Sequence, residues 1–167
     1  MMAVLANLEQ TALSLWVRES PSLLAFPFIL YLHTLGLAML AGIHVGLALW
    51  LLARRTVPPF DLASIYRVMW LGFGINAVSG LVLLAAYPAK ALTNWIFFAK
   101  LAAVAAALWT LQRTKDEIVV ANGMAAREIT QRGRLLALAS LFLWAGTILA
   151  GRLLAYTHHI LLASEGF

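Results

Sequence analysis

The sequence predicts an all-α fold, an integral membrane four-helix bundle with an amphipathic interfacial helix near its N-terminus. Of the 167 residues, 63% are hydrophobic and only 11% are charged, whereas charged residues make up about a quarter of an ordinary soluble domain. The apolar residues also gather in four long runs, and about 20 such residues cross a bilayer. A water-soluble domain of this size does not bury so much apolar surface. We therefore expect one membrane domain over residues 1–167.

Residues 2–18 are predicted to form a short helix on the outer membrane surface. Apolar side chains recur there at helical spacing, at Leu5, Leu8, Ala12, Leu15 and Trp16. Charged side chains such as Glu9 and Arg18 lie between them. This pattern is typical of a helix that lies in the membrane interface. Ser20-Pro21 then turns the chain into the bilayer.

The four apolar runs predict membrane spans over about 22–53, 67–88, 91–113 and 134–160. Along the second span, Gly72, Asn76 and Gly80 recur every four residues. Such a stripe of small and polar residues normally faces another helix. Between the last two spans, Asn122-Gly123 is the only strong helix breaker. Both spans are therefore expected to continue beyond the membrane as a helical hairpin.

Basic residues predict the orientation of the chain. They flank or fill the first and third connections, at Arg54, Arg55, Arg67, Arg113, Lys115, Arg127, Arg132 and Arg134. The second connection has only Lys90. By the positive-inside rule, the two basic connections are cytoplasmic and both termini are periplasmic, in a bacterial inner membrane. This topology accounts for the net charge of +5, so we expect no nucleic-acid partner.

Two histidines inside the first span give the most direct indication of function. His33 and His44 are eleven residues apart, and eleven steps of about 100° return to within roughly 20° of the start. An ideal helix thus places both rings on one face, about 16 Å apart along the axis. Imidazole is uncommon at membrane depth and is a preferred ligand of iron and copper. The chain has no cysteine, which excludes thiolate metal sites and disulfides.

A second group of candidate residues lies near the end of the fourth span. At 1.5 Å per residue, His33 is about 31 Å from the cytoplasmic edge, His158 about 36 Å and Arg152 about 27 Å. Two imidazoles facing each other, with a cation beside them to neutralise a propionate, suit a b-type haem. His159 is an equal candidate for the second ligand. Gly36, one turn after His33, would let a flat macrocycle approach the backbone.

An inner site is also conceivable. His44 is level with Asn76, at about 15 Å and 14 Å from the cytoplasmic edge, and either ligates a second haem or pairs with Asn76. Lys100 lies about 20 Å from that edge. There it is either functional or snorkels toward the surface. In the same way, Arg152 and the two C-terminal histidines either belong to a site or lie at the wet end of the span.

Short motifs give the chain a family resemblance over roughly residues 22–156. The segment Leu32-His33-Thr34-Leu35-Gly36-Leu37-Ala38-Met39-Leu40-Ala41-Gly42 resembles the first helix of the four-helix protoporphyrinogen IX oxidases of bacterial haem synthesis. Trp95-Ile96-Phe97-Phe98-Ala99-Lys100-Leu101 resembles their later helix with an essential lysine. CopD-like copper-resistance membrane domains share this plan. Gly80 and Gly151-Arg152-Leu153-Leu154-Ala155-Tyr156 look closer to an uncharacterised bacterial family related to both.

The resemblance implies that His33 and Lys100 are functional and that haem b is the cofactor. His44, His158 and His159 depart from the family pattern, as does the Gly-Arg-Leu-Leu-Ala-Tyr segment. We therefore expect a redox protein with one or two haems b, working as an electron-transfer subunit with membrane or periplasmic redox partners. The alternatives are a protoporphyrinogen oxidase-like enzyme with Lys100 as a catalytic residue, a cofactor-free structural subunit, and a copper-handling membrane protein.

Overall fold

The computed structural model describes residues 7–124 and 128–164, with the backbone alone for 155–164. Within these ranges the chain is mostly helical and contains no strand, apart from an isolated bridge between Thr56 and Glu128. The elements are α2 (Ala12–Glu19), α3 (Phe26–Leu37), the π-helical turn η1 (Ala38–Gly42), α4 (Ile43–Arg54), α5 (Leu62–Ala86), α6 (Pro88–Leu92), α7 (Trp95–Asn122) and α8 (Gln131–Ser164).

Four of the helical segments are long and apolar enough to cross a membrane, namely Phe26–Arg54, Leu62–Ala86, Trp95–Asn122 and Gln131–Leu154. The predicted all-α, multi-pass membrane fold is therefore confirmed. The predicted hairpin is also helical, because α7 continues to Asn122 and α8 begins at Gln131.

Side-chain caps explain where the second and third spans begin. The second span starts at Leu62, before the predicted boundary, because the Asp61 carboxylate accepts the Ala63 N–H over 3.0 Å. The hydrogen bond from the Ser64 hydroxyl also keeps the pKa of Asp61 below its usual value. The third span starts at Trp95, later than predicted, because Asn94 accepts the Ile96 N–H over 2.9 Å. The residues between the two spans form α6.

The N-terminal helix is shorter than predicted and is docked on the bundle. Thr11 caps α2 and separates it from the preceding residues, and of the predicted helix, residues 2–6 lie outside the described ranges. The Ser14 hydroxyl donates a hydrogen bond of 3.1 Å to the Ala86 carbonyl at the end of α5. The Ala89 N–H donates to Glu9 Oε1 over 3.3 Å. These bonds hold α2 against the turn between α5 and α6.

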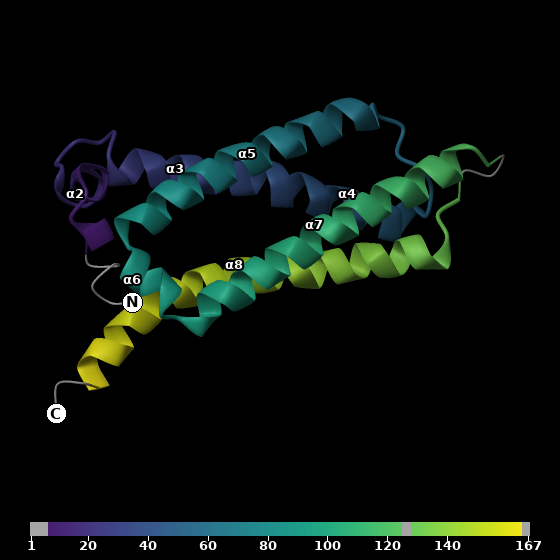
Figure 1. Ribbon diagram of the computed structural model, residues 1–167. Coiled ribbons are helices and arrows are strands. Elements are labelled where there is room, and N and C mark those ends of the chain that lie inside the picture. Colours follow the sequence, from purple (N-terminus) through teal and green to yellow (C-terminus); the bar gives the residue numbers. More distant parts are fainter. Residues whose placement is uncertain (1–6, 125–127, 165–167) are drawn as a thin grey trace.

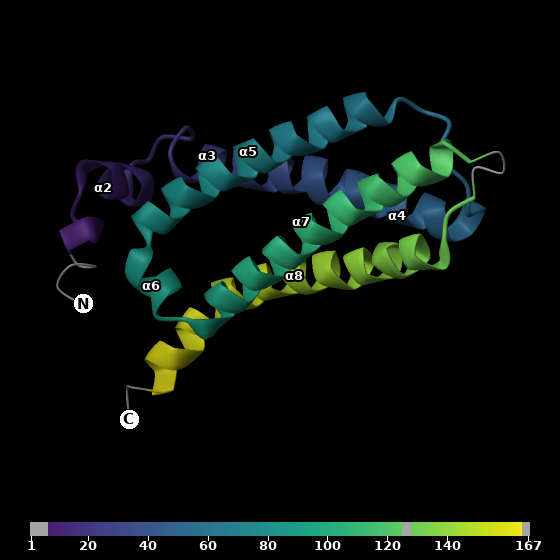
Figure 2. The ribbon, with the colours of Figure 1, turned by 45° about the vertical axis from the view of Figure 1, so that its right-hand side comes forward.

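The spans are arranged as two helix pairs (Figures 1 and 2). α3 packs along α5 and α7 along α8, and the pairs meet mainly where α4 packs against α8. α2, α6 and the C-terminal turns of α8 lie together at one end of the bundle. We call the opposite end, with the α4–α5 and α7–α8 connections, the basic end. Its described cations are Arg54, Arg55, Arg67, Arg113, Lys115, Arg132 and Arg134.

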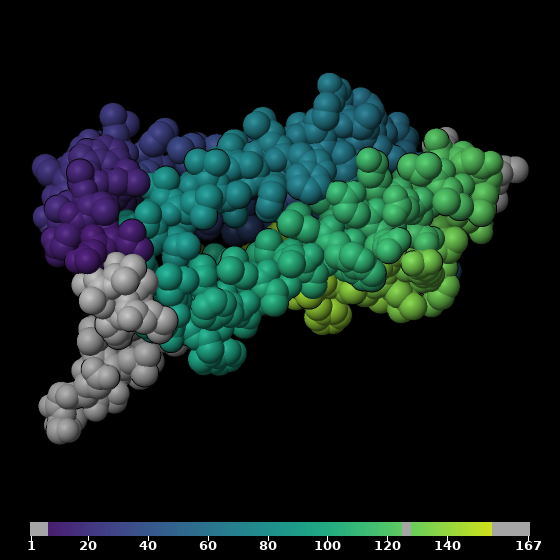
Figure 3. Space-filling model, in the orientation of Figure 1, coloured from purple at the N-terminus to yellow at the C-terminus, as the bar shows by residue number. Residues whose placement is uncertain are grey.

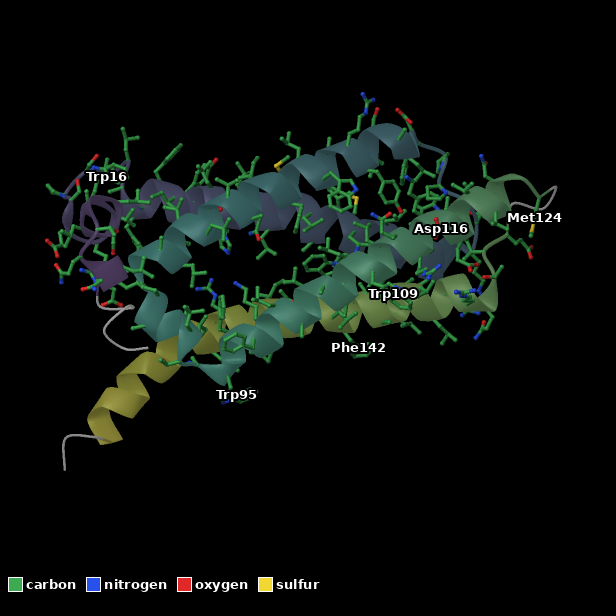
Figure 4. The ribbon with its side chains drawn as sticks, in the orientation of Figure 1. Trp16, Trp95, Trp109, Asp116, Met124 and Phe142 are labelled. Atoms are coloured by element: carbon green, nitrogen blue, oxygen red, sulfur yellow. The ribbon has the colours of Figure 1, made fainter. Side chains whose placement is uncertain are left out.

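The hydrophobic core occupies the half of the bundle nearer the basic end. Leu51, Met69, Leu111 and Trp144, one from each span, are at most 1% exposed there. The outer surface is equally apolar, with Trp95 75% and Phe142 77% exposed. Figure 4 shows these two side chains pointing away from the bundle. An apolar exterior of this kind indicates a lipid bilayer environment.

Candidate functional site

His33 lies on α3, in the half of the bundle away from the core, and is held by α5. Its half-buried ring has Nδ1 3.0 Å from the Asn76 carbonyl oxygen and 3.2 Å from the Ser79 hydroxyl. A backbone carbonyl only accepts hydrogen bonds, so Nδ1 carries the proton. In the neutral ring this leaves the lone pair on Nε2. Histidines that ligate metals are commonly oriented by this type of bond.

The segment of α5 opposite His33 supports the ring from several directions. The Asn76 side-chain amide donates a 2.6 Å hydrogen bond to the His33 carbonyl. The Ser79 hydroxyl donates to the Ile75 carbonyl over 2.6 Å, which fixes its position beside Nδ1. A β-carbon placed on Gly80 would lie 3.0 Å from His33 Cε1. Thus the predicted stripe on the second span does face another helix, and it forms part of the surface against which the His33 ring packs.

Gly36 has a different role from the one predicted. A β-carbon placed there would lie 2.6 Å from both the Asn76 nitrogen and the Gly72 carbonyl oxygen. The backbone of α5 therefore occupies the space beside Gly36, and no macrocycle can approach it on this side. This prediction was wrong because the absence of a side chain serves helix packing, as small residues usually do between membrane helices.

Lys100 approaches the same region from the other helix pair. It is half-buried on α7, and its charge acts electrostatically on His33. A β-carbon on Gly151 of α8 would lie 3.8 Å from Lys100 Nζ. Within the described residues the ammonium forms neither a hydrogen bond nor an ion pair. The two helix pairs thus bring a histidine and an amine together, and Figure 3 shows a hollow between α5 and α7.

The eleven-residue spacing predicts that His33 and His44 share one helix face, but in the structure they lie on different faces. The π-helical turn Ala38–Gly42 lies between the two histidines. It inserts about one residue into a turn and so sets the following side chains back by about 100°. As a result, His33 faces α5, whereas His44 faces α8.

His44 pairs with Trp144, not with Asn76. Trp144 Nε1 donates a 2.9 Å hydrogen bond to His44 Nδ1, and the rings meet edge to face. Indole N–H is only a donor, so Nδ1 must accept and the proton of the neutral ring is on Nε2. That nitrogen is buried and has no hydrogen-bond partner among the described residues. The structure therefore contradicts the predicted pairing of His44 with Asn76, whereas ligation of a second haem by His44 stays a prediction.

The remaining predicted site residues are on the last part of α8. Arg152 is exposed, one residue beyond Gly151. The side chains of His158 and His159 lie outside the described residues. Nowhere in the described chain, the region of His33 included, do three or more His, Cys, Asp or Glu side chains form a group that could hold a metal ion.

Sequence reasoning did not single out Ser79, Gly151 or Trp144 as site or pairing residues. Ser79 directly precedes Gly80 of the predicted stripe on the second span, which gave a usable signal. For Trp144 there was none, because tryptophan in a membrane helix normally indicates interfacial placement or packing.

No family model, curated protein or solved structure matches this chain. The resemblance to the four-helix protoporphyrinogen IX oxidases therefore stays a prediction, and the function is argued from the site alone.

Proposed function

We propose that this protein binds haem b through His33 and works as an electron-transfer subunit in the membrane. The observation that carries the proposal is the 3.0 Å contact between His33 Nδ1 and the Asn76 carbonyl. It leaves the Nε2 lone pair for a ligand, and Nε2 makes no hydrogen bond with any described residue. The porphyrin supplies four iron ligands itself, so a haem site needs only one or two protein side chains.

Two cations of the other helix pair, one on α7 and one on α8, support the same assignment. A haem carries two propionates, and an unpaired ammonium in a membrane requires an anionic partner. We propose that Lys100 neutralises one propionate and Arg152 the other. His158 or His159, near the C-terminal end of α8, would hold the haem together with His33.

Three residues of α5 hold the His33 ring in position. Asn76 and Ser79 fix the tautomer and orientation of the His33 ring, and Gly80 makes room for it. A bound haem would supply a one-electron couple. Its electrons would come from and go to other membrane or periplasmic redox subunits. We propose that the basic end is cytoplasmic and both termini are periplasmic, in a bacterial inner membrane.

A second candidate function is oxidation of a porphyrinogen. It is favoured by Lys100, a half-buried amine on α7 close to Gly151 of α8, which suits a substrate that carries carboxylates. This function predicts porphyrinogen oxidation by the purified protein. It also predicts that Lys100→Met abolishes turnover, whereas Lys90→Met does not.

Removal of the proposed ligand tests the haem assignment. We expect His33→Ala to lose most of the bound haem and the b-type reduced-minus-oxidised spectrum, because imidazole coordination is lost. The matched control is His44→Phe, which removes the other imidazole of the same span and keeps a ring against Trp144. We expect this variant to retain the cofactor.

The measurement is haem content per protein at equal expression, together with the optical spectrum. A His33→Ala protein with the wild-type spectrum would contradict the proposal. So would a wild-type protein that takes up no haem when it is expressed with an adequate haem supply.

A further inference from the structure

A second candidate site lies at the basic end, between α5 and α7. It is a groove of about 490 Å³, lined by Tyr66, Arg67 and Trp70 of α5 and by Lys115 and Val119 of α7. It belongs to the first turns of α5 and the last turns of α7, where these spans reach the membrane surface. His33 and Lys100 are in the opposite half of the bundle, so the groove is separate from the proposed haem site.

Two cations in the groove form no ion pair with a described carboxylate, although Asp61 acts electrostatically on one of them, Arg67. Arg67 and Lys115 are both exposed, and neither forms an ion pair in the part of the chain that the structure describes. Arg67 uses one nitrogen to donate to the Ser64 hydroxyl over 2.8 Å. Lys115 Nζ lies 5.5 Å from the centroid of the Tyr66 ring, in a cation–π contact. Their donors are therefore largely available to an anion.

A buried hydroxyl adds an unsatisfied donor to these cations. Tyr66 is only 5% exposed, and its hydroxyl is buried without a hydrogen-bond partner among the described residues. A buried polar group without a hydrogen-bond partner lowers the free energy of unfolding by about 1–3 kcal/mol. A phosphate oxygen between Arg67 and Lys115 would be such a partner.

The rest of the lining is apolar, which favours an amphiphile over a free ion. Trp70 is 42% and Val119 62% exposed, and both extend the groove along the lipid-facing surface. Basic pockets between membrane helices at the cytoplasmic surface bind anionic headgroups. Asp116 is next to Lys115 and is exposed, but it does not line the groove.

We propose that this groove binds the headgroup of an anionic phospholipid. The phosphodiester lies between Arg67 and Lys115 and accepts the Tyr66 hydroxyl, while the acyl chains run along Trp70 and Val119. The lipid would tie the first turns of α5 to the last turns of α7, which belong to different helix pairs.

Native mass spectrometry of the full chain in detergent tests the proposal. The probes are phosphatidylglycerol and phosphatidylcholine with identical acyl chains. We expect the wild-type protein to retain one phosphatidylglycerol and to bind phosphatidylcholine at least about tenfold more weakly. We also expect the double variant Arg67→Gln, Lys115→Gln to lose this preference.

The double variant Arg54→Gln, Arg113→Gln is the matched control. It removes two charges from the same end, but these guanidinium groups rest on Trp50 and Trp109, outside the groove. We expect it to retain the lipid. Tyr66→Phe should weaken retention about fivefold, the effect of one lost hydrogen bond.

Equal retention by the groove variant and the control would overturn the proposal. Equal binding of the two lipids would also overturn it. If inorganic phosphate alone at millimolar concentration displaces the lipid and binds with the same dependence on Arg67 and Lys115, the ligand is a free phosphate and the lipid assignment is wrong. None of these outcomes depends on haem, because the groove is at the opposite end from His33.

Discussion

The imidazoles of His33 and His44 differ in which ring nitrogen carries the proton, and the neighbouring group decides this. A carbonyl faces Nδ1 of His33, whereas an indole N–H faces Nδ1 of His44. The first arrangement leaves a lone pair on Nε2, and the second places a proton there. Two residues of the same type in the same span are therefore held as different tautomers in their neutral forms.

At the scale of the residue, Gly80→Ala tests whether the position of the His33 ring depends on the α5 surface against which it packs. The added methyl would lie 3.0 Å from Cε1 and 3.3 Å from Nδ1 of the ring. Because the contact is tighter than normal packing, we expect the ring to shift by a few tenths of an ångström and haem retention to fall several-fold. Haem content and the reduced-minus-oxidised spectrum measure the effect.

Gly74→Ala is the control for this prediction. It lies on the same helix, and nothing is within 4 Å of an added β-carbon. Equal haem content in both variants would mean that the Gly80 position does not control the ring.

At the scale of the element, the π-helical turn Ala38–Gly42 determines which neighbours the first span contacts. Before it, α3 packs on α5, and after it, α4 packs on α8. One extra residue in a turn rotates the rest of the helix by about 100°. The first span can therefore use different faces to bind the two helix pairs together. π-helical turns of this kind are frequent at functional sites.

The close approach of α3 to α5 predicts a large effect of Gly36→Ala. The new β-carbon would lie 2.6 Å from two backbone atoms of α5, which no side-chain rotation relieves. We expect the helices to separate and the free energy of unfolding to fall by about 1–3 kcal/mol. Denaturant titration of the protein in detergent micelles, followed by tryptophan fluorescence, measures the change.

Gly46→Ala provides the comparison within the same span. An added β-carbon there has no neighbour within 4 Å, so we expect stability to be unchanged or slightly higher. If Gly36→Ala were no less stable than Gly46→Ala, the tight crossing of α3 and α5 would be wrong.

At the scale of the whole molecule, the two halves of the bundle differ in their packing. Near the basic end, side chains of all four spans form one core. In the other half, the α3–α5 and α7–α8 pairs separate around the hollow shown in Figure 3. The proposed haem site of His33 and Lys100 belongs to this second half, away from the core.

The orientation of the whole bundle is the subject of a further prediction. If the basic end is cytoplasmic, a reporter inserted after Met124 should be active when it is one that works in the cytoplasm, and inactive when it is one that works in the periplasm. A reporter fused after the end of α8 should be active only as a periplasmic one. Alkaline phosphatase and green fluorescent protein fusions measure this directly. The reverse pattern at both positions would invert the proposed topology.

The sequence by itself determined the fold class, the four spans and the charge asymmetry between the two ends. These depend on the length and composition of single segments, and a bilayer accepts only segments that satisfy their own backbone hydrogen bonds. The stripe of Gly72, Asn76 and Gly80 was likewise enough to predict a helix-facing surface, because the spacing of small residues is a local property.

Only the tertiary structure decided which side chains meet. An ideal helix places His33 and His44 on one face, but the π-helical turn rotates them onto different faces. No pattern of residues in the sequence predicted this turn. The pairing of His44 with Trp144 and the closing of Gly36 by α5 depend on how two helices cross. The way in which helices cross depends on the packing of many side chains together. The residues that end up in contact therefore cannot be identified from their own positions in the sequence.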